Sequence, residues 1–230
     1  MDVIEAIESR KSIRAFRPDP VPKEVLTQIL EVALRAPSTD NTQPWELAIV
    51  TGTVLDELKK AMSEKMGAPT EFTPDIPFPV LNYKPPYVDR SKKQGKKVFE
   101  SMGIARDDWP RRMEWYRYMA RFMDAPVGII LYVERYLGAY AILDAGLFLE
   151  NLMLAAINYG LGSCSQMAVV LYPEILRKAL NIPESKLIVC GVAIGYPDES
   201  AAVNRFRSER EPLDTFASWH GFISEGSGLR

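Results

Sequence analysis

Residues 136–159 are predicted to form one long helix that is apolar on nearly every face, and this segment constrains the fold more than any other. Gly160 follows it, and glycine commonly ends a helix because it tolerates the left-handed conformation. A helix that is apolar all round offers no face to water, so it lies in a core or in a large interface. Other elements of the chain, or a second chain, must therefore cover it.

Two further apolar segments, 126–133 and 186–196, have the composition of buried strands, and a short strand is expected at 46–50. Residues 162–167 are expected to turn into extended chain. Apolar spacing predicts a short helix at the start of the chain and helices at 23–35, 53–66, 91–102, 107–123 and 173–180. A few strands that alternate with helices favour an α+β fold with a small central sheet.

Composition excludes several classes of protein. The 28 basic and 30 acidic residues give a formal net charge of −2, whereas nucleic-acid binders carry a basic face. The single histidine, His220, excludes a two-histidine metal site, and Cys164 and Cys190 form neither a disulfide framework nor a zinc cluster. The first ten residues lack the apolar stretch of a signal peptide, and the uncharged apolar run 125–133 is too short to span a bilayer. We expect a cytoplasmic protein without nucleic-acid or membrane partners.

Residues 1–230 are expected to form a single domain. Six prolines between residues 67 and 87 forbid a helix interior or a central strand. A loop of this length is typically functional, so the segment 67–121 is interpreted as a lid or insertion. The polar C-terminal segment 203–230 has no core of its own and must pack on something.

Two polar motifs in the first half of the chain are candidate binding sites. In Arg10-Lys11-Ser12-Ile13-Arg14, one more helical turn would point both arginines the same way, and guanidinium groups suit a phosphate. The alternative is a solvated basic surface. The loop 36–45 lies between prolines, and its amides suit the polar edge of a ring. The alternative is a surface loop whose side chains cap turns.

Two motifs in the second half complete the set. The glycines of Gly160-Leu161-Gly162-Ser163-Cys164-Ser165-Gln166 would let the backbone approach a flat ligand, or they simply end a helix. Three arginines between residues 204 and 212 would close on a phosphate or remain solvated.

Taken together, these motifs resemble the FMN-dependent nitroreductase family. The strings SRKSIRAF, APSTDNTQPWELAIV, GLGSCSQ, AIGYPD and REPLD occur in the family's order and at roughly its spacing. Each string is weak alone, but their joint order is specific. The resemblance covers about the whole chain, is weakest over 67–121, and is closest to nitrobenzoate-reductase-like members.

The resemblance implies a nitroreductase-like fold, with a small central mixed sheet flanked by helices, and an intertwined homodimer with FMN at the subunit interface. The helix 136–159 would lie in that interface, and the tail 203–230 would wrap around the partner. The FMN phosphate and ribityl group would be held by Arg10, Lys11, Ser12, Arg14 and Arg210, with Arg207 the weaker candidate for the last position.

The same resemblance assigns the flavin ring. Pro37, Ser38, Asn41 and Gln43 would contact it from the other subunit. Backbone N–H groups of Ser165, Gln166, Met167 and Ala168 would face it. Arg121 would lie near flavin N1 and O2, where a cation stabilises the anionic reduced ring.

The implied activity is an oxidoreductase in which NADH or NADPH reduces FMN and an electron-poor acceptor, such as a nitroaromatic or a quinone, then reoxidises it in a ping-pong cycle. No side chain is assigned as catalytic, because the chemistry belongs to FMN N5. The same scaffold also hosts reductive dehalogenation, enoate reduction and dehydrogenation, and a non-enzymatic flavin-binding protein is a further alternative.

The chain departs from the family pattern on the substrate side. Tyr118 and Met119 stand where many relatives have an asparagine, and Met167 and Ala168 where others have an acid and a glycine. A pocket wall is expected from the aromatic and basic residues of the middle segment, which alternatively form a satellite core and a solvated surface. These are Phe72, Phe78, Tyr83, Tyr87, Trp109, Trp115, Lys84, Arg90, Lys92 and Lys93.

Overall fold

The centre of the fold is a four-stranded sheet in the order β1-β2-β4-β3. The computed structural model describes residues 2–68, 71–77 and 82–222. The strands are β1 (Glu46–Val50), β2 (Val127–Glu134), β3 (Gly162–Gln166) and β4 (Lys186–Gly195). The α+β class is confirmed, and the turn into extended chain expected at 162–167 is the edge strand β3, which is extended from Gly162 onward.

All three strand pairs are antiparallel, which corrects the expectation of a mixed sheet within the chain. Parallel pairing in the described residues is limited to one isolated bridge, between Ser12 and Ser163. The segment that makes this bridge lies beside β3 without becoming a fifth strand.

One face of the sheet is covered by α2 (Lys23–Ala33) and α6 (Gly138–Asn158). Side chains alternate along β2, so Ile129 and Leu131 point to this face whereas Ile130 points to the other. Trp45 stacks on Phe148 of α6 at 5.3 Å between ring centroids. Burial on both faces explains why β2 is apolar almost throughout.

The other face is covered by α3 (Gly52–Met66), α7 (Pro173–Leu180) and the end of α5 (Trp109–Ala120). The helix expected at 107–123 stops at Ala120, because residues 122–124 all have positive φ. This turn inserts Phe122 beneath β2 and β4, where Gly128 leaves room for the ring.

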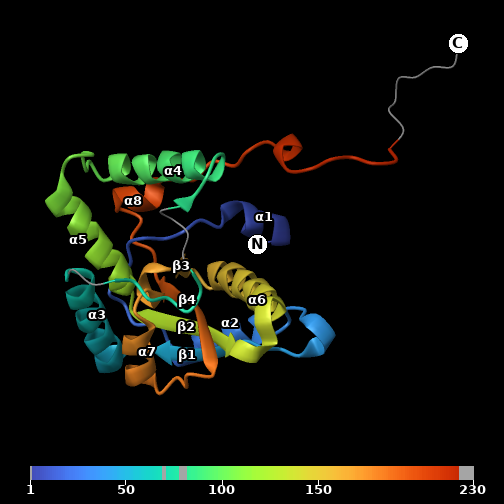
Figure 1. Cartoon of the computed structure of the whole chain (residues 1–230), viewed down its shortest axis with the longest axis horizontal. Coiled ribbons are helices and arrows are strands. Elements are labelled where there is room, and N and C mark those ends of the chain that lie inside the picture. Colours follow the sequence, from blue (N-terminus) through green and yellow to red (C-terminus); the bar gives the residue numbers. More distant parts are fainter. Residues whose placement is uncertain (1, 69–70, 78–81, 223–230) are drawn as a thin grey trace, which may run out of the picture.

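A third cluster lies beyond β3. The helix α4 (Tyr87–Ser101) begins four residues before the expected 91, and it packs through Val98 and Phe99 on α5 and on α8 (Ala202–Arg205). Figure 1 shows α4 lying across α8, with the described tail running past the end of α4 and away from the body. Trp115 belongs to this cluster, as the satellite-core alternative has it.

The long helix has one buried face and one exposed face. Asp144, Ala145, Phe148 and Leu152 are buried against the sheet and α2, whereas Tyr140, Leu143 and Leu147 are exposed. The helical stretch 135–158 is long and apolar enough to cross a membrane by length and composition alone. Nearby, the exposed Val3, Ile4 and Ile7 lie on α1 (Val3–Ser9), which contacts α6.

Candidate functional site

The basic motif near the N-terminus is extended, not helical. The helix α1 ends at Ser9, and residues 10–16 run along β3, where the Ile13 N–H donates to the Ser163 carbonyl at 3.0 Å. Ile13 is buried, so the alternation of an extended chain turns Ser12 and Arg14 to the opposite side. The expected helical turn is therefore wrong, but the two side chains still share one side.

Gly162 allows this close approach. A Cβ atom at position 162 would lie 2.5 Å from the Ile13 side chain, so any other residue would push the extended segment away from β3. Gly162, the second glycine of GLGSCSQ, is thus required by packing against the N-terminal motif.

Asn204 fixes the N-terminal motif to α8. Its side-chain oxygen accepts from the backbone N–H groups of Arg14 at 2.7 Å and Ala15 at 3.2 Å. Its amide nitrogen donates to the carbonyls of Ala15 at 2.7 Å and Asp198 at 2.9 Å. Asn204 is buried, and this set uses its amide on both sides.

Tyr118 holds the same segment from α5. Its hydroxyl donates to the Arg14 carbonyl at 3.1 Å. Burial raises the pKa of Tyr118 to about 12, so the group remains a neutral donor. From the sequence, Tyr118 stands out only as a departure from the family pattern, and position 204 only as the start of the arginine-rich segment 204–212. Neither the isolated aromatic nor the lone amide carried a signal for this role.

Ser12 and Arg14 line a cavity of about 490 Å³ between the N-terminal motif, α4 and the tail. Arg210 and Phe216 line it from the tail. The structure therefore brings together three of the residues that the resemblance assigned to a phosphate: Ser12, Arg14 and Arg210. Arginine side chains and a hydroxyl match a phosphate chemically, because arginine donates in a planar fork.

Arg10 and Lys11 point elsewhere in the described chain. The Arg10 Nε lies 3.4 Å from Glu150 Oε1 on α6. The Lys11 ammonium donates to the Asn204 carbonyl at 2.6 Å. These two basic residues thus tie the motif to α6 and α8 and do not line the cavity.

The loop 36–45 is attached to α6. The Thr39 N–H donates to the buried carboxylate of Asp144 at 3.0 Å, and the Gln43 N–H donates to Ser38 Oγ at 3.0 Å. Asn41 and Gln43 have positive φ, which asparagine tolerates better than most residues. Pro37, Asn41 and Gln43 are exposed, Ser38 is partly exposed, and the cavity lining includes none of the four.

Asp144 was not singled out from the sequence, although it holds the loop that the resemblance assigns to the flavin. It is a buried acid in an apolar helix, and this contrast was the available signal. Its bonds to Thr39 make α6 the support of the whole loop.

The end of β3 presents one exposed and one buried polar side chain. Ser165 is exposed, whereas the buried Gln166 donates to the Met119 carbonyl at 3.1 Å and its Oε1 lacks a partner among the described residues. Met167 and Ala168 follow at a partly exposed position. The exposed Ser165 and the partly exposed Met167 and Ala168 lie at the edge where the resemblance places the flavin ring, and that assignment stays a prediction.

Arg121 is not brought to the cavity. Its guanidinium pairs with Glu114 at 3.0 Å and Asp124 at 3.2 Å, at the junction of α3 and α5. Burial lowers the pKa of Arg121, whereas the hydrogen bonds and charges of Asp124 and Glu114 raise it, and the pKa is raised overall. Arg121 therefore does not line the cavity with Ser12, Arg14 and Arg210, and its place near flavin N1 and O2 stays a prediction.

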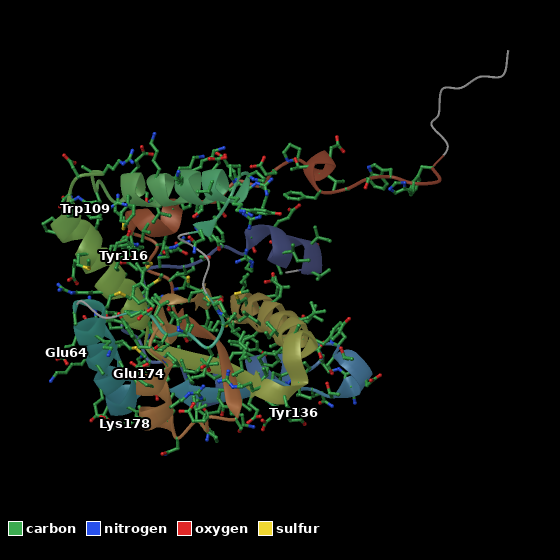
Figure 2. All side chains as sticks on the ribbon, viewed as in Figure 1. Glu64, Trp109, Tyr116, Tyr136, Glu174 and Lys178 are labelled. Carbon is green, nitrogen blue, oxygen red and sulfur yellow. The ribbon has the colours of Figure 1, made fainter. Side chains whose placement is uncertain are left out.

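The predicted pocket-wall residues are also dispersed. Arg90 and Lys93 line the cavity, whereas Trp109 is exposed at the start of α5. Figure 2 shows Trp109 at the edge of the molecule, beside the start of α5. Phe78 lies outside the described residues.

Comparison with known proteins adds three findings. A model of the nitroreductase family matches residues 7–196. The chain is 34% identical to a 4-nitrobenzoate reductase of Pseudomonas putida over 223 residues, 96% of each chain. Among solved structures, it is similar to an FMN- and NADPH-dependent nitroreductase of a Sphingopyxis strain, with a TM-score of 0.90 and 34% identity over 96% of this chain and all of that one.

A second solved structure agrees. The FMN-dependent nitroreductase of Mycobacterium smegmatis in complex with NADPH gives a TM-score of 0.87 and 31% identity, over 94% of this chain and 97% of that one. The match therefore includes the middle segment where the sequence motifs are weakest.

Proposed function

The chain belongs to the nitroreductase family, and from this premise we propose that it is an FMN-dependent oxidoreductase that uses NAD(P)H to reduce nitroaromatic compounds. The observation that carries the proposal is the meeting of Ser12, Arg14 and Arg210 at one cavity, from opposite ends of the sequence. This donor set fits the phosphate of FMN. NADPH is named for two related structures, and NADH remains the alternative reductant.

When bound, FMN supplies the redox chemistry, accepting hydride from NAD(P)H and passing reducing equivalents to the acceptor in turn. The protein contributes binding and orientation. Ser12, Arg14 and Arg210 would hold the phosphate. Backbone N–H groups from Ser165 to Met167 would face the ring, with the Gln166 side chain turned inward.

Asn204 and Tyr118 would keep the Arg14 backbone in place by the hydrogen bonds described above. Arg10 and Lys11 would fix the N-terminal motif to α6 and α8. Arg121 would act on the flavin at longer range, through its charge. We assign no side chain as a proton donor, since the only histidine, His220, is exposed in the tail.

We also propose a homodimer. The exposed apolar residues of α1, α6 and the tail have no cover within the described chain, and Leu143 of α6 and Trp219 of the tail are more than half exposed. A second copy would cover them and bring the loop 36–45, with Pro37, Ser38, Asn41 and Gln43, to the neighbouring site. A membrane is the competing partner for α6, but the helix carries Asp144 and Glu150, and a cytoplasmic location is proposed.

The dimer has a direct test. Leu143→Glu should give a monomer by light scattering and lose FMN, because a carboxylate cannot be buried unpaired. Val54→Glu on α3 is the matched control, since Val54 is also exposed but lies on the opposite side of the sheet. A Leu143→Glu variant that remains dimeric with full FMN would refute the interface.

The first test of the function is the spectrum of the purified protein. Flavin absorbance, release of FMN on denaturation, bleaching by NADPH or NADH, and recovery with 4-nitrobenzoate are expected. A colourless protein that takes up no added FMN would refute the proposal. A flavoprotein that neither nucleotide reduces would favour a non-enzymatic role.

The phosphate site has its own test. Arg14→Ala should weaken FMN binding by about ten- to a hundredfold, the value of one charge-assisted contact, and leave riboflavin binding unchanged. Arg17→Ala is the matched control, because Arg17 lies in the same segment but pairs with Asp19 at the surface. Equal losses for FMN and riboflavin would argue against a phosphate contact.

A further inference from the structure

Two carboxylates lie where the proposed phosphate would bind. The cavity is lined by five basic side chains, and also by Glu209 and Glu211, which flank Arg210 in the tail. Acids beside an anion site repel the anion, so simple electrostatics gives no reason for them there. Their contacts supply one.

Both acids pair with one face of α4. Glu209 accepts from Lys93 at 2.8 Å and also from Lys97. Glu211 lies 3.5 Å from the guanidinium of Arg90. Positions 90, 93 and 97 are three and four residues apart, so they form one stripe along the helix.

The tail has little else to hold it within the described chain. Its residues from 209 to 216 are exposed, and the side chain of Arg210 bonds only within its own turn, to Ser208 Oγ at 2.8 Å and to the Glu209 carbonyl at 3.1 Å. The Arg90 guanidinium lies over the Phe216 ring at 5.2 Å. Within the described chain, contacts to the α4 stripe therefore hold the tail on both sides of Arg210.

We propose that Glu209 is a positioning residue for the cofactor phosphate. By bridging Lys93 and Lys97, it fastens the tail to α4 and places the adjacent Arg210 across the cavity from Arg14. The inference rests on the proposed function, because it takes the ligand to be the phosphate of FMN.

The charges around Glu209 agree with this role. Hydrogen bonds from Lys93 and Lys97 lower the pKa of Glu209 to about 2, and Glu209 in turn raises the pKa of Lys93. A single exposed ion pair stabilises little, but two lysines on one carboxylate form a network. The contact is open to solvent, so salt should weaken it.

The test compares Glu209→Gln with Glu100→Gln. Glu100 lies on α4 and pairs with Lys96 away from the cavity, so both variants lose one surface carboxylate. Dissociation constants for FMN and for riboflavin are measured by flavin fluorescence on titration with apo-protein, at low and high salt. Tryptic cleavage after Arg210 in the apo-protein reports tail docking independently of any flavin.

We expect Glu209→Gln to weaken FMN binding about three- to tenfold, to leave riboflavin binding unchanged, and to speed cleavage after Arg210, with Glu100→Gln like wild type. High salt should reduce the difference between the two variants. Glu209→Asp should recover part of the FMN affinity, because it restores the charge on a shorter side chain.

Simple repulsion predicts the opposite sign, since removing an anion from the cavity would tighten FMN binding. Tighter or unchanged FMN binding by Glu209→Gln, or equal losses for FMN and riboflavin, would overturn the proposal. If the wild-type protein binds no FMN, the proposed function fails. If the wild type binds FMN and Glu209→Gln binds it equally, only the positioning role fails.

Discussion

Asn204→Ala should both destabilise the protein and weaken its hold on FMN. The side chain makes four hydrogen bonds of 2.7–3.2 Å, three to the backbone of Arg14 and Ala15 in the extended N-terminal motif and one to the Asp198 carbonyl before α8. Alanine removes all four and leaves two backbone N–H groups, those of Arg14 and Ala15, without that acceptor. The backbone that carries Arg14 then loses its main restraint on the α8 side.

The magnitude follows from the count of bonds. A protein hydrogen bond contributes about 1 kcal/mol net, and a buried group left unpaired costs about 1–3 kcal/mol. Asn204 is only 3% exposed, so water reaches the orphaned groups only if the segment moves. We therefore expect a loss of about 3–4 kcal/mol in the free energy of unfolding, a large part of the stability of an ordinary domain.

Urea unfolding of the apo-protein measures the first effect and FMN titration the second. Asn158→Ala is the control, because Asn158 is exposed at the end of α6. Asn204→Asp keeps the acceptor but loses the two donated bonds, so it should fall between the wild type and Asn204→Ala. A loss below about 0.5 kcal/mol for Asn204→Ala, with unchanged FMN affinity, would refute the reasoning.

Two further predictions concern buried groups away from the cavity. Asp75→Asn should cost about 3 kcal/mol in urea unfolding, because it removes the buried carboxylate 2.5 Å from the buried Arg177 guanidinium and leaves that group paired with the exposed Glu184; Asp56→Asn at the surface should cost little. Burial raises the pKa of Cys164, and that of Cys190 to about 11, so neither thiol should be alkylated in the native protein at about pH 8.5, whereas both should be in urea, as mass spectrometry would show. The folded state keeps these protons longer than the unfolded chain, so stability should fall as the pH rises from about 8.5 towards 11. Unchanged stability over that range, or rapid alkylation of the native protein, would contradict the assignment of buried thiols.

Most helices and strands were predicted well from the sequence, because they depend on the spacing of apolar residues within each segment. The apolar run at 126–133 predicts a buried strand, and the apolar spacing at 173–180 predicts a helix. The strand β2 and the helix α7 match these predictions closely. Gly160 ends α6 with a φ of +70°, as its position predicts. These features depend on neighbouring residues, so no partner needs to be known.

The errors arose where distant segments decide the conformation. The motif at 10–14 looks like one more turn of α1, but its backbone bonds to Ser163 and Asn204 hold it extended. The helix before residue 121 stops early because Phe122 turns into the core beneath Gly128. Neither the contact of the N-terminal motif with Ser163 and Asn204 nor the packing of Phe122 beneath Gly128 can be predicted from local helix propensity.

The site was predicted in part, for the same reason. Ser12, Arg14 and Arg210 were grouped by resemblance, and the structure brings them to one cavity. Arg121 was assigned to the flavin ring by the same resemblance; in the described chain it pairs with Glu114 and Asp124, and its place at the ring stays a prediction. Glu209 and Glu211 could not be assigned a role from the sequence, because their partners on α4 are more than a hundred residues away in the chain and only the folded structure brings them together.

The two halves of the proposed site lie on different supports, and this has a consequence for assembly. The phosphate half depends on Asn204 and α4, within one chain. The loop with Asn41 and Gln43 is held on α6 by the hydrogen bond from Thr39 to Asp144. The exposed apolar face of the same helix is the proposed dimer interface. If the loop completes the ring site of a second copy, FMN binding and dimerisation are linked, and each must strengthen the other by the same factor. The exposed apolar face of α6 then contributes to cofactor binding through the dimer, although no residue of α6 lines the cavity in the described chain.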